Sequence, residues 1–513
     1  MEVANTDSKQ RKFFSAFRKV KPPPPEKADA PKKALDLPYD IIVEIVQYLG
    51  ENYVLKLCLL SRSLFNLLVP ALYSSVDLRS SGSCRAALKR LVMEPHLATH
   101  MRKFVIRPNN PSRWANEKPV DESWVVAVLE QLASAGQLEN LHTFIWDGVE
   151  SPIDSLWLIL RLNCPHLRTI GTCVGLTTQK IDPGSHLFDF RDLLGFSLVT
   201  QKRIRWTNIF TGQLLPDRLW DMLLVHSPHL IELTLDGTCL ISQLWNTRRV
   251  FSGRWRSLRS LSLGNVSTRA LETDTADGAT FIKAHPALEK LAFFGNFSPH
   301  THSLSTMPLV PLPRLRVFSG KISQLKELTG DQLPSLWSLR LTDHFSPAAK
   351  FDLLREFPSV VSLAVCVNFL DTFNGNHAGF FERLLSACAQ LTHVEISSTS
   401  PFSLYHFSAA IHHTPHLLSF ILTLPRKRPA QLAKFSLQLT SKHTQLQEFT
   451  IRDVHDWDHE DQLNDNYRLS DIGVCYVLGS QSQSQSPRLL RINESGLGPL
   501  GRYSNSMTRP IPS

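Results

Sequence analysis

A recurring pattern of apolar residues most constrains how this chain of 513 residues can fold. The pattern consists of an aliphatic anchor, two residues, a second apolar residue, one residue and usually a third apolar residue. Copies begin at Met101, Leu141, Leu167, Leu193, Leu230, Leu258, Leu288, Leu315, Leu336, Val360, Leu391, Leu417 and Leu446. From Leu230 onward, successive copies begin 21 to 31 residues apart. A period of this length is typical of solenoid repeats.

Each copy predicts a β-strand preceded by a helix. The second and third anchors are two residues apart, so a strand directs both to one face. Helical patterns precede several copies, at residues 219–225, 351–357 and 380–385, and prolines then stop the helix at positions 165, 228, 286, 358 and 415. Repeated units of helix and strand predict an α/β fold, a right-handed solenoid with parallel strands on the concave side and helices on the convex side.

These copies resemble leucine-rich repeats. The match is loose, because the loop asparagine of the regular repeat, three residues after the third anchor, occurs only at Asn296 and Asn368. The resemblance implies an irregular leucine-rich repeat domain over residues 81–495, followed by a flexible tail at residues 496–513. The alternative is another kind of α/β solenoid.

The chain begins differently. Residues 1–34 contain four consecutive prolines, at positions 22–25, among many lysines and arginines, and this composition predicts a disordered extended arm. The basic residues could serve nuclear import or bind an anionic partner, or the arm could be a solvated tail without such a role. Residues 35–80 then predict a small all-α module: a first helix with apolar residues from Leu37 to Leu49, and a second apolar run from Val54 to Leu68 that ends before Pro70.

This module resembles the F-box. The similarity rests on Leu37-Pro38-Tyr39-Asp40-Ile41-Ile42, then Ile45, Tyr48, Leu49, Leu55, Leu57, Leu60, Ser61-Arg62-Ser63-Leu64, Leu67 and Leu68. Leu64 or Phe65 stands where tryptophan is common in the family. The alternative is a helical cap on the repeat domain. The resemblance implies that an apolar face binds the Skp-type linker subunit of a Skp–cullin–F-box ubiquitin ligase, through Leu37, Pro38, Ile41, Ile45, Leu49, Leu57 and Leu60.

In that family the repeats would bind a protein substrate for ubiquitin-dependent degradation. Strand alternation places polar and exposed apolar positions between the anchors, on the face opposite the core. The candidate substrate surface is therefore Glu232, Thr234, Asp236, Phe294, Arg340, Glu395, Ile421 and Arg452. Phe294 and Ile421 are the most informative candidates, since large apolar residues facing a groove suggest a protein contact.

No catalytic motif appears in the sequence. Phosphate loops, dinucleotide fingerprints, nucleophile elbows and His-Glu-x-x-His helices are absent, so we expect no enzyme and no cofactor. His455 and His459 have a spacing that suits a helical metal pair, but their polar surroundings favour a solvated loop and no metal.

The sequence has no apolar stretch long enough to span a membrane and no apolar core of a signal peptide. It therefore predicts a cytoplasmic or nuclear protein. Much of the formal charge of +9 lies in the arm, which disfavours a nucleic-acid-binding body. Two alternatives to a ligase adaptor remain: a leucine-rich repeat interaction scaffold outside any ligase, and a nucleic-acid binder with a basic tail.

Overall fold

The computed structural model separates the chain into two units, Met1–Leu72 and Tyr73–Ser513. The residues that it describes are 39–49, 51–109, 118–148, 150–174, 182–200, 215–236, 245–264, 266–267, 275–294, 312–322, 325, 335–345, 351–367, 377–398, 404–425, 446, 448–454, 473–478 and 489–495. The basic arm and the residues after 495 lie outside this set.

The first unit consists of three short helices, α2 (Tyr39–Gln47), α3 (Glu51–Cys58) and most of α4 (Arg62–Ser74). Ser61 begins α4, because its Oγ accepts a hydrogen bond from the backbone N–H of Leu64 at 3.1 Å. The helices enclose a small core of Val46, Val54, Cys58 and Leu68.

Helix α4 corrects one prediction. The sequence predicted that the second apolar run ends before Pro70, but Pro70 lies inside α4. A proline at this point removes one helical hydrogen bond. Packing offsets this loss, since Leu67 and Leu68 before Pro70, and Ala71 and Leu72 after it, all contact the core of the first unit.

A sixteen-stranded sheet forms the centre of the second unit. All neighbouring strands of this sheet from β1 to β16 pair in parallel. These strands are β1 (Ser75–Leu78), β2 (Lys103–Ile106), β3 (Thr143–Trp146), β4 (Thr169–Val174), β5 (Gly195–Thr200), β6 (Glu232–Asp236), β8 (Ser260–Gly264), β10 (Lys290–Phe294), β11 (Val317–Gly320), β12 (Ser338–Phe345), β13 (Ser362–Val367), β14 (His393–Ser398), β15 (Ser419–Pro425) and β16 (Glu448–Val454). The predicted mixed α/β architecture with parallel strands is confirmed.

The second anchors of the repeated pattern lie in one register across these strands. They form a continuous buried row of Phe104, Phe144, Ile170, Phe196, Leu233, Leu261, Leu291, Phe318, Leu339, Leu363, Val394 and Phe420. The row faces helices, as the ring contacts of Phe144 with Trp157 and of Phe420 with Phe407 demonstrate. Each strand therefore completes the core of its neighbours, which a single repeat cannot do.

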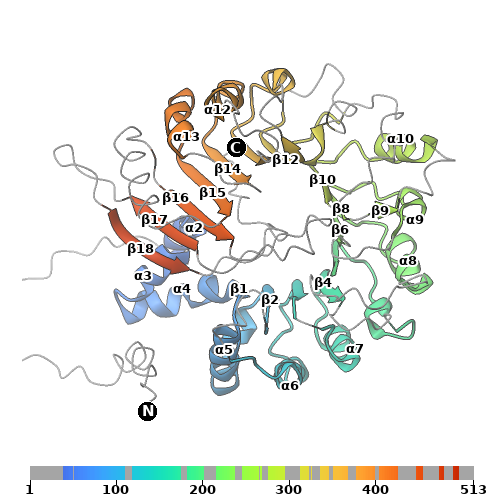
Figure 1. Ribbon diagram of the computed structural model, residues 1–513. Helices are drawn as coiled ribbons and strands as arrows, with labels where there is room; N and C mark the ends of the chain where they lie inside the picture. Colours follow the sequence, from blue (N-terminus) through green and yellow to red (C-terminus); the bar gives the residue numbers. More distant parts are fainter. Residues whose placement is uncertain are drawn as a thin grey trace, which may run out of the picture. The chain divides into compact units, whose positions relative to one another are not determined.

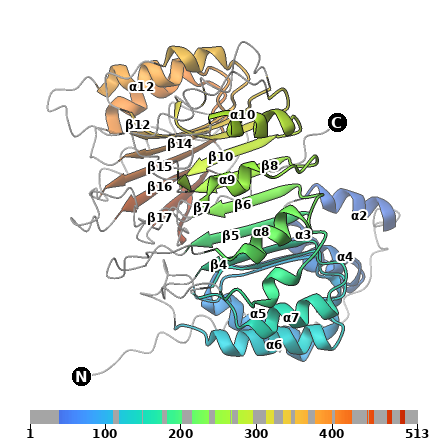
Figure 2. The same ribbon diagram turned by 90° about the vertical axis from the view of Figure 1, so that its right-hand side faces the viewer.

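Helices cover one face of the sheet (Figures 1 and 2). They are α5 (Ser81–Met93), α6 (Glu122–Ser134), α7 (Asp154–Asn163), α8 (Asp217–Leu224), α9 (Thr247–Phe251), α10 (Thr275–Ala284), α12 (His377–Ser386) and α13 (Leu404–Ala410), with short 3-10 helices η1 (Pro95–His100), η3 (His186–Asp189), η4 (Asp352–Glu356) and η5 (Ile411–His413). The layer is uneven. Between β4 and β5 the described residues contain only the single turn η3, and η4 replaces the helix predicted at residues 351–357.

The two ends of the sheet differ from the predicted succession of parallel strands. At one end, β1 lies within the range that the sequence assigned to the helical module, but it pairs with β2 of the second unit. At the other end, β17 (Gly473–Leu478) and β18 (Leu489–Ser495) pair antiparallel with β16 and with each other. A separate pair of two-residue strands, β7 (Trp245–Asn246) and β9 (Val266–Ser267), lies outside this sheet. No helix among the described residues has both the length and the apolar character needed to cross a bilayer.

Candidate functional site

The helices of the first unit leave large apolar side chains exposed. On α2, Ile41 and Ile45 are four residues apart, so they lie on one side of the helix, with 39% and 44% of their surfaces exposed. The turn after α3 exposes Leu59 and Leu60, at 65% and 70%. Three short helices offer too little interior to bury these residues as well as the core. The exposed set also includes Tyr48, Tyr53, Leu55 and Phe65.

The seven predicted docking residues do not share one environment. Ile41, Ile45 and Leu60 are exposed. Leu49 and Leu57 are half-buried and pack against the core of the first unit, because the inner side of each short helix must also supply that core. Leu37 and Pro38 lie outside the described residues. The structure thus places Leu49 and Leu57 partly in the core, and the exposed Leu59 was not among the predicted docking residues.

Two side-chain features of the first unit bear on its chemistry, a cation–π contact and a buried thiol. The ammonium group of Lys56 lies 5.2 Å from the centre of the Tyr53 ring, a cation–π contact. Burial raises the pKa of the Cys58 thiol above its ordinary value, and its backbone hydrogen bond opposes this shift only in part. A thiol with a raised pKa is a poor nucleophile at neutral pH, so Cys58 serves as a small residue of the core.

On the second unit, the predicted substrate residues lie on the face of the sheet opposite the buried anchor row, here called the helix-free face. Glu232 is exposed, and Thr234, Arg340 and Ile421 are half-buried. Asp236 and Glu395 are buried, with 7% and 8% exposed, so the prediction that they are open to a partner is wrong. The side chains of Phe294 and Arg452 lie outside the described residues.

Register explains the burial of Glu395. Arg340, Ala364 and Glu395 lie side by side on β12, β13 and β14. Because alanine is small, the guanidinium of Arg340 passes over it and its Nη2 donates to Oε2 of Glu395 at 2.7 Å. Two residues that the sequence treated as separate partner contacts are therefore one internal ion pair.

A second ion group lies on the first three strands. Nη1 of Arg107 is 2.5 Å from Asp77, and its Nε is 2.9 Å from Asp147. Burial lowers the pKa of Arg107, and the charge of Asp77 opposes this shift. The register row of Arg340 runs across the sheet to Asp77, and on β4 to β11 it holds small side chains: Gly171, Ser197, Thr234, Ser262, Ala292 and Ser319. The helix-free face therefore carries charges near both ends of this row and small residues between them.

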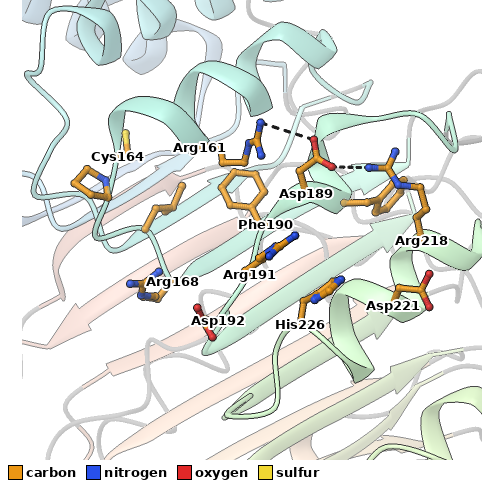
Figure 3. A pocket seen from close by; sticks show the side chains of 13 residues that line it. Arg161, Cys164, Arg168, Asp189, Phe190, Arg191, Asp192, Arg218, Asp221 and His226 are labelled. Carbon is orange, nitrogen blue, oxygen red and sulfur yellow. Dashed lines mark hydrogen bonds and ion pairs between the residues drawn. The ribbon is translucent and has the colours of Figure 1, made fainter.

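The second unit also has a pocket of about 500 Å³ that the sequence did not predict (Figure 3). Its residues come from the segments that lead into β4, β5 and β6, so it lies at the edge where these strands begin. Four arginines line it: Arg161, Arg168, Arg191 and Arg218. In sequence, Arg168 directly precedes β4 and Arg191 lies shortly before β5. Sequence spacing does not reveal that these arginines share a cavity with Arg161 and Arg218.

One carboxylate organises two of these arginines. Arg218 and Arg161 contact Asp189 at 2.5 and 3.9 Å, from opposite sides in Figure 3. Nδ1 of His186 lies 2.9 Å from the same carboxylate. The hydrogen bond with His186, followed by the charges of the two arginines, lowers the pKa of Asp189. Asp189 therefore remains ionised and holds the two guanidinium groups in place.

Comparison with known proteins concerns mainly the first unit. Residues 34–68 match the family model described as the F-box domain. The chain contains an F-box domain. No curated protein matches the chain. Among solved structures, a chain from the crystal structure of the Rad7 and Elc1 complex in yeast is similar, with 14% identity and a TM-score of 0.35. The similarity covers 76% of this chain and 94% of that chain. A similarity at this level gives no information about function.

The F-box match covers α2, α3 and the first half of α4. The exposed residues Ile41, Ile45, Leu59 and Leu60 all lie within it, so the F-box displays uncovered aliphatic side chains on its surface. Among the described residues, no group of three or more His, Cys, Asp or Glu side chains is arranged to hold a metal ion. The segment with His455 and His459 lies outside the described residues.

Proposed function

We propose that this protein is the substrate-recognition adaptor of a Skp–cullin–F-box-type ubiquitin ligase. The F-box would bind a Skp-type linker subunit and, through it, a cullin, while the second unit would bind a protein substrate for ubiquitin-dependent degradation. One observation carries the proposal: the F-box at residues 34–68 displays Ile41, Ile45, Leu59 and Leu60 on its surface.

The exposed aliphatic residues explain how docking would gain affinity. Full burial of one such side chain contributes roughly 1.5–3 kcal/mol. Four of them under a partner could therefore support stable binding even after the entropic cost of association is subtracted. The half-buried Leu49 and Leu57 would stiffen the helices that present these residues, since both pack on the F-box core.

Co-purification of the full chain with a Skp-type linker subunit tests the proposal. Ile45→Asp should reduce linker binding by at least a hundredfold, roughly, because an aspartate at a buried contact loses the apolar gain and adds desolvation of a charge. Val92→Asp is the matched control: Val92 is a β-branched residue on α5, exposed to the same extent as Ile41. Unchanged linker binding by the Ile45→Asp protein would refute the proposal.

We further propose that the parallel array is a right-handed leucine-rich repeat solenoid whose helix-free face contacts the substrate. The register row of second anchors, and the 21- to 31-residue spacing of the copies, support this assignment. Among the predicted residues whose side chains the structure describes, Glu232, Thr234, Arg340 and Ile421 are not buried. The adaptor would contribute no catalytic group to ubiquitin transfer.

We propose a cytoplasmic or nuclear location, in which thiols remain reduced. Cys58, Cys164 and Cys388 are buried and form no disulfide, which suits such a compartment. The second candidate function is an interaction scaffold outside any ligase. The large size of the repeat unit relative to the F-box favours this alternative. Affinity purification that recovers protein partners without any linker subunit would support it.

A further inference from the structure

We propose that the pocket between the starts of β4, β5 and β6 binds one anionic side chain of a peptide, a phosphorylated or carboxylate residue flanked by apolar residues. The idea rests on the proposed function only in regarding that peptide as part of a substrate. Binding itself requires neither the F-box nor a linker subunit, so the two proposals can fail separately.

The repeat between β4 and β5 borders the pocket, and its described residues contain only the short 3-10 helix η3. Its neighbours have α7 and α8, with ten and eight residues, whereas η3 has four. A single 3-10 turn cannot fill the space that an α-helix fills at this point of the outer layer. The cavity of about 500 Å³ is within the usual range for ligand sites, roughly 300–1,000 Å³.

The arginines in the pocket fall into two pairs. Arg161 and Arg218 are held by Asp189. Arg168 and Arg191 are exposed and make no ion pair with any acidic side chain that the structure describes. Arginine presents a planar fork of N–H donors that matches the oxygens of a phosphate or carboxylate. Arg168 and Arg191 are therefore available to bind an anion, while Asp189 holds Arg161 and Arg218 in place.

The backbone positions Arg191 firmly. The following residue, Asp192, has a φ of 54°, in the left-handed region that few residues other than glycine, asparagine and aspartate adopt. Its N–H donates to the carbonyl oxygen of His226 at 2.7 Å, which ties the start of β5 to the start of β6. The N–H of Leu193 donates to Oγ of the buried Ser227, which adds a second tie. The loop that carries Arg191 is thus preorganised for binding.

Apolar groups surround the charges. Leu167, Phe188 and Phe190 are buried and line the wall of the pocket, and a low-dielectric wall strengthens an ion pair beside it. Leu162 and Val225 directly adjoin the lining residues Arg161 and His226 in sequence and are largely exposed, at 65% and 64%. An isolated phosphate ion would leave these residues uncovered, whereas a peptide could cover them with residues on either side of its anionic group.

Two carboxylates favour a peptide over a polyanion. Asp192 and Asp221 also line the pocket, and both are exposed. They would repel a second or third negative charge next to the first, as in nucleic acid or an anionic membrane. A peptide with one acidic group beside neutral or basic residues avoids that repulsion.

The test uses the purified full chain and arrays of random peptides whose central residue is fixed as phosphoserine, glutamate or unmodified serine. We expect retention of the phosphoserine or glutamate arrays over the serine array, and the preferred array identifies the anion. Arg168→Gln/Arg191→Gln should weaken the binding of selected peptides about tenfold or more, because charge-assisted hydrogen bonds are lost. Arg256→Gln/Arg314→Gln is the matched control, since both of these arginines are exposed and remote from the pocket lining.

A second variant tests the selection against polyanions. Asp192→Asn/Asp221→Asn keeps the backbone conformation at position 192, which asparagine tolerates, and should increase retention of peptides with several acidic residues. Equal retention of the serine and anionic arrays would overturn the proposal, and so would unchanged peptide affinity in the Arg168→Gln/Arg191→Gln protein. A third contrary result is that the unmodified protein prefers a labelled oligonucleotide to the peptides and that Arg168→Gln/Arg191→Gln abolishes this binding.

Discussion

The F-box and the repeat unit use the same aliphatic residue types, but these residues have opposite fates. In the repeat unit, the anchors of each strand are covered by the neighbouring strands and the outer helices, and Leu233, Leu261 and Leu291 are inaccessible to solvent or nearly so. In the F-box, three short helices bury only a few residues, and Ile45 and Leu60 remain exposed. Stacking supplies a core wherever the pattern repeats, whereas a single small module leaves apolar surface available for a partner.

The largest stability effect is expected in the anchor row. Phe318 is fully buried, between Leu291 on β10 and Leu339 on β12. Phe318→Ala should lower the free energy of unfolding of the second unit by about 3–5 kcal/mol, because it removes a large side chain and leaves a cavity. Urea unfolding followed by circular dichroism measures this loss. A loss below about 1 kcal/mol would show that the sheet does not depend on its aligned anchors.

A smaller effect is expected at the ion pair that spans Ala364. Arg340→Ala removes the guanidinium from the buried Glu395, and this should destabilise the second unit by about 1–3 kcal/mol. Arg316→Ala, at an exposed site before β11, is the control and should change stability little. The double variant Arg340→Met/Glu395→Gln should recover part of the loss, since no charge is then buried. Equal stability of the Arg340→Ala protein and the unmodified protein would contradict the inferred pair.

The stability of the second unit should depend on pH because of one buried histidine. His285 is fully buried. Its Nδ1 lies 2.6 Å from the carbonyl oxygen of Phe281, to which it must donate, and its Nε2 accepts from the N–H of Trp255 at 3.1 Å. Both nitrogens are thus occupied in the neutral ring. Burial lowers the pKa of His285 below the ordinary value of 6.5, and the nearby charge of Arg254 acts in the same direction.

Since the unfolded chain binds this proton more readily than the folded one, the stabilisation is complete above about pH 6.5 and decreases as pH falls below it, by up to about 1.4 kcal/mol per pH unit. Urea unfolding at pH 7.5, 6.5 and 5.5 measures the slope. His285→Leu should flatten it, whereas His229→Ala, at an exposed histidine, should leave it unchanged. A slope that persists in the His285→Leu protein would assign the effect to other groups.

The smallest stability effect is expected on the surface of the F-box. Ile45→Ala should change the free energy of unfolding by no more than about 0.5 kcal/mol, yet reduce linker affinity by about tenfold, because the side chain contributes only in the complex. Val46→Ala, at a buried neighbour, should instead destabilise the F-box. Thermal unfolding and titration with the linker subunit separate the two outcomes. A marked loss of stability in the Ile45→Ala protein would place Ile45 in the core.

The sequence by itself determined the elements that depend on local periodicity. The anchor spacing predicted the strands of the parallel array, and the prolines at positions 228 and 358 correctly marked where helix gives way to strand. The apolar pattern from Ile41 to Leu68 predicted the F-box helices. Local patterns suffice here because each element needs only its own apolar face, and the stack then aligns equivalent faces.

Only the tertiary structure decided how individual side chains are used. It buried Glu395 against Arg340, because their strands align on either side of Ala364. It placed Leu49 against the F-box core, although the same helical pattern left Ile45 exposed. It also gathered Arg168 and Arg191 around a cavity beside η3. These outcomes depend on contacts between residues distant in sequence, and neither residue type nor spacing along one element encodes such contacts.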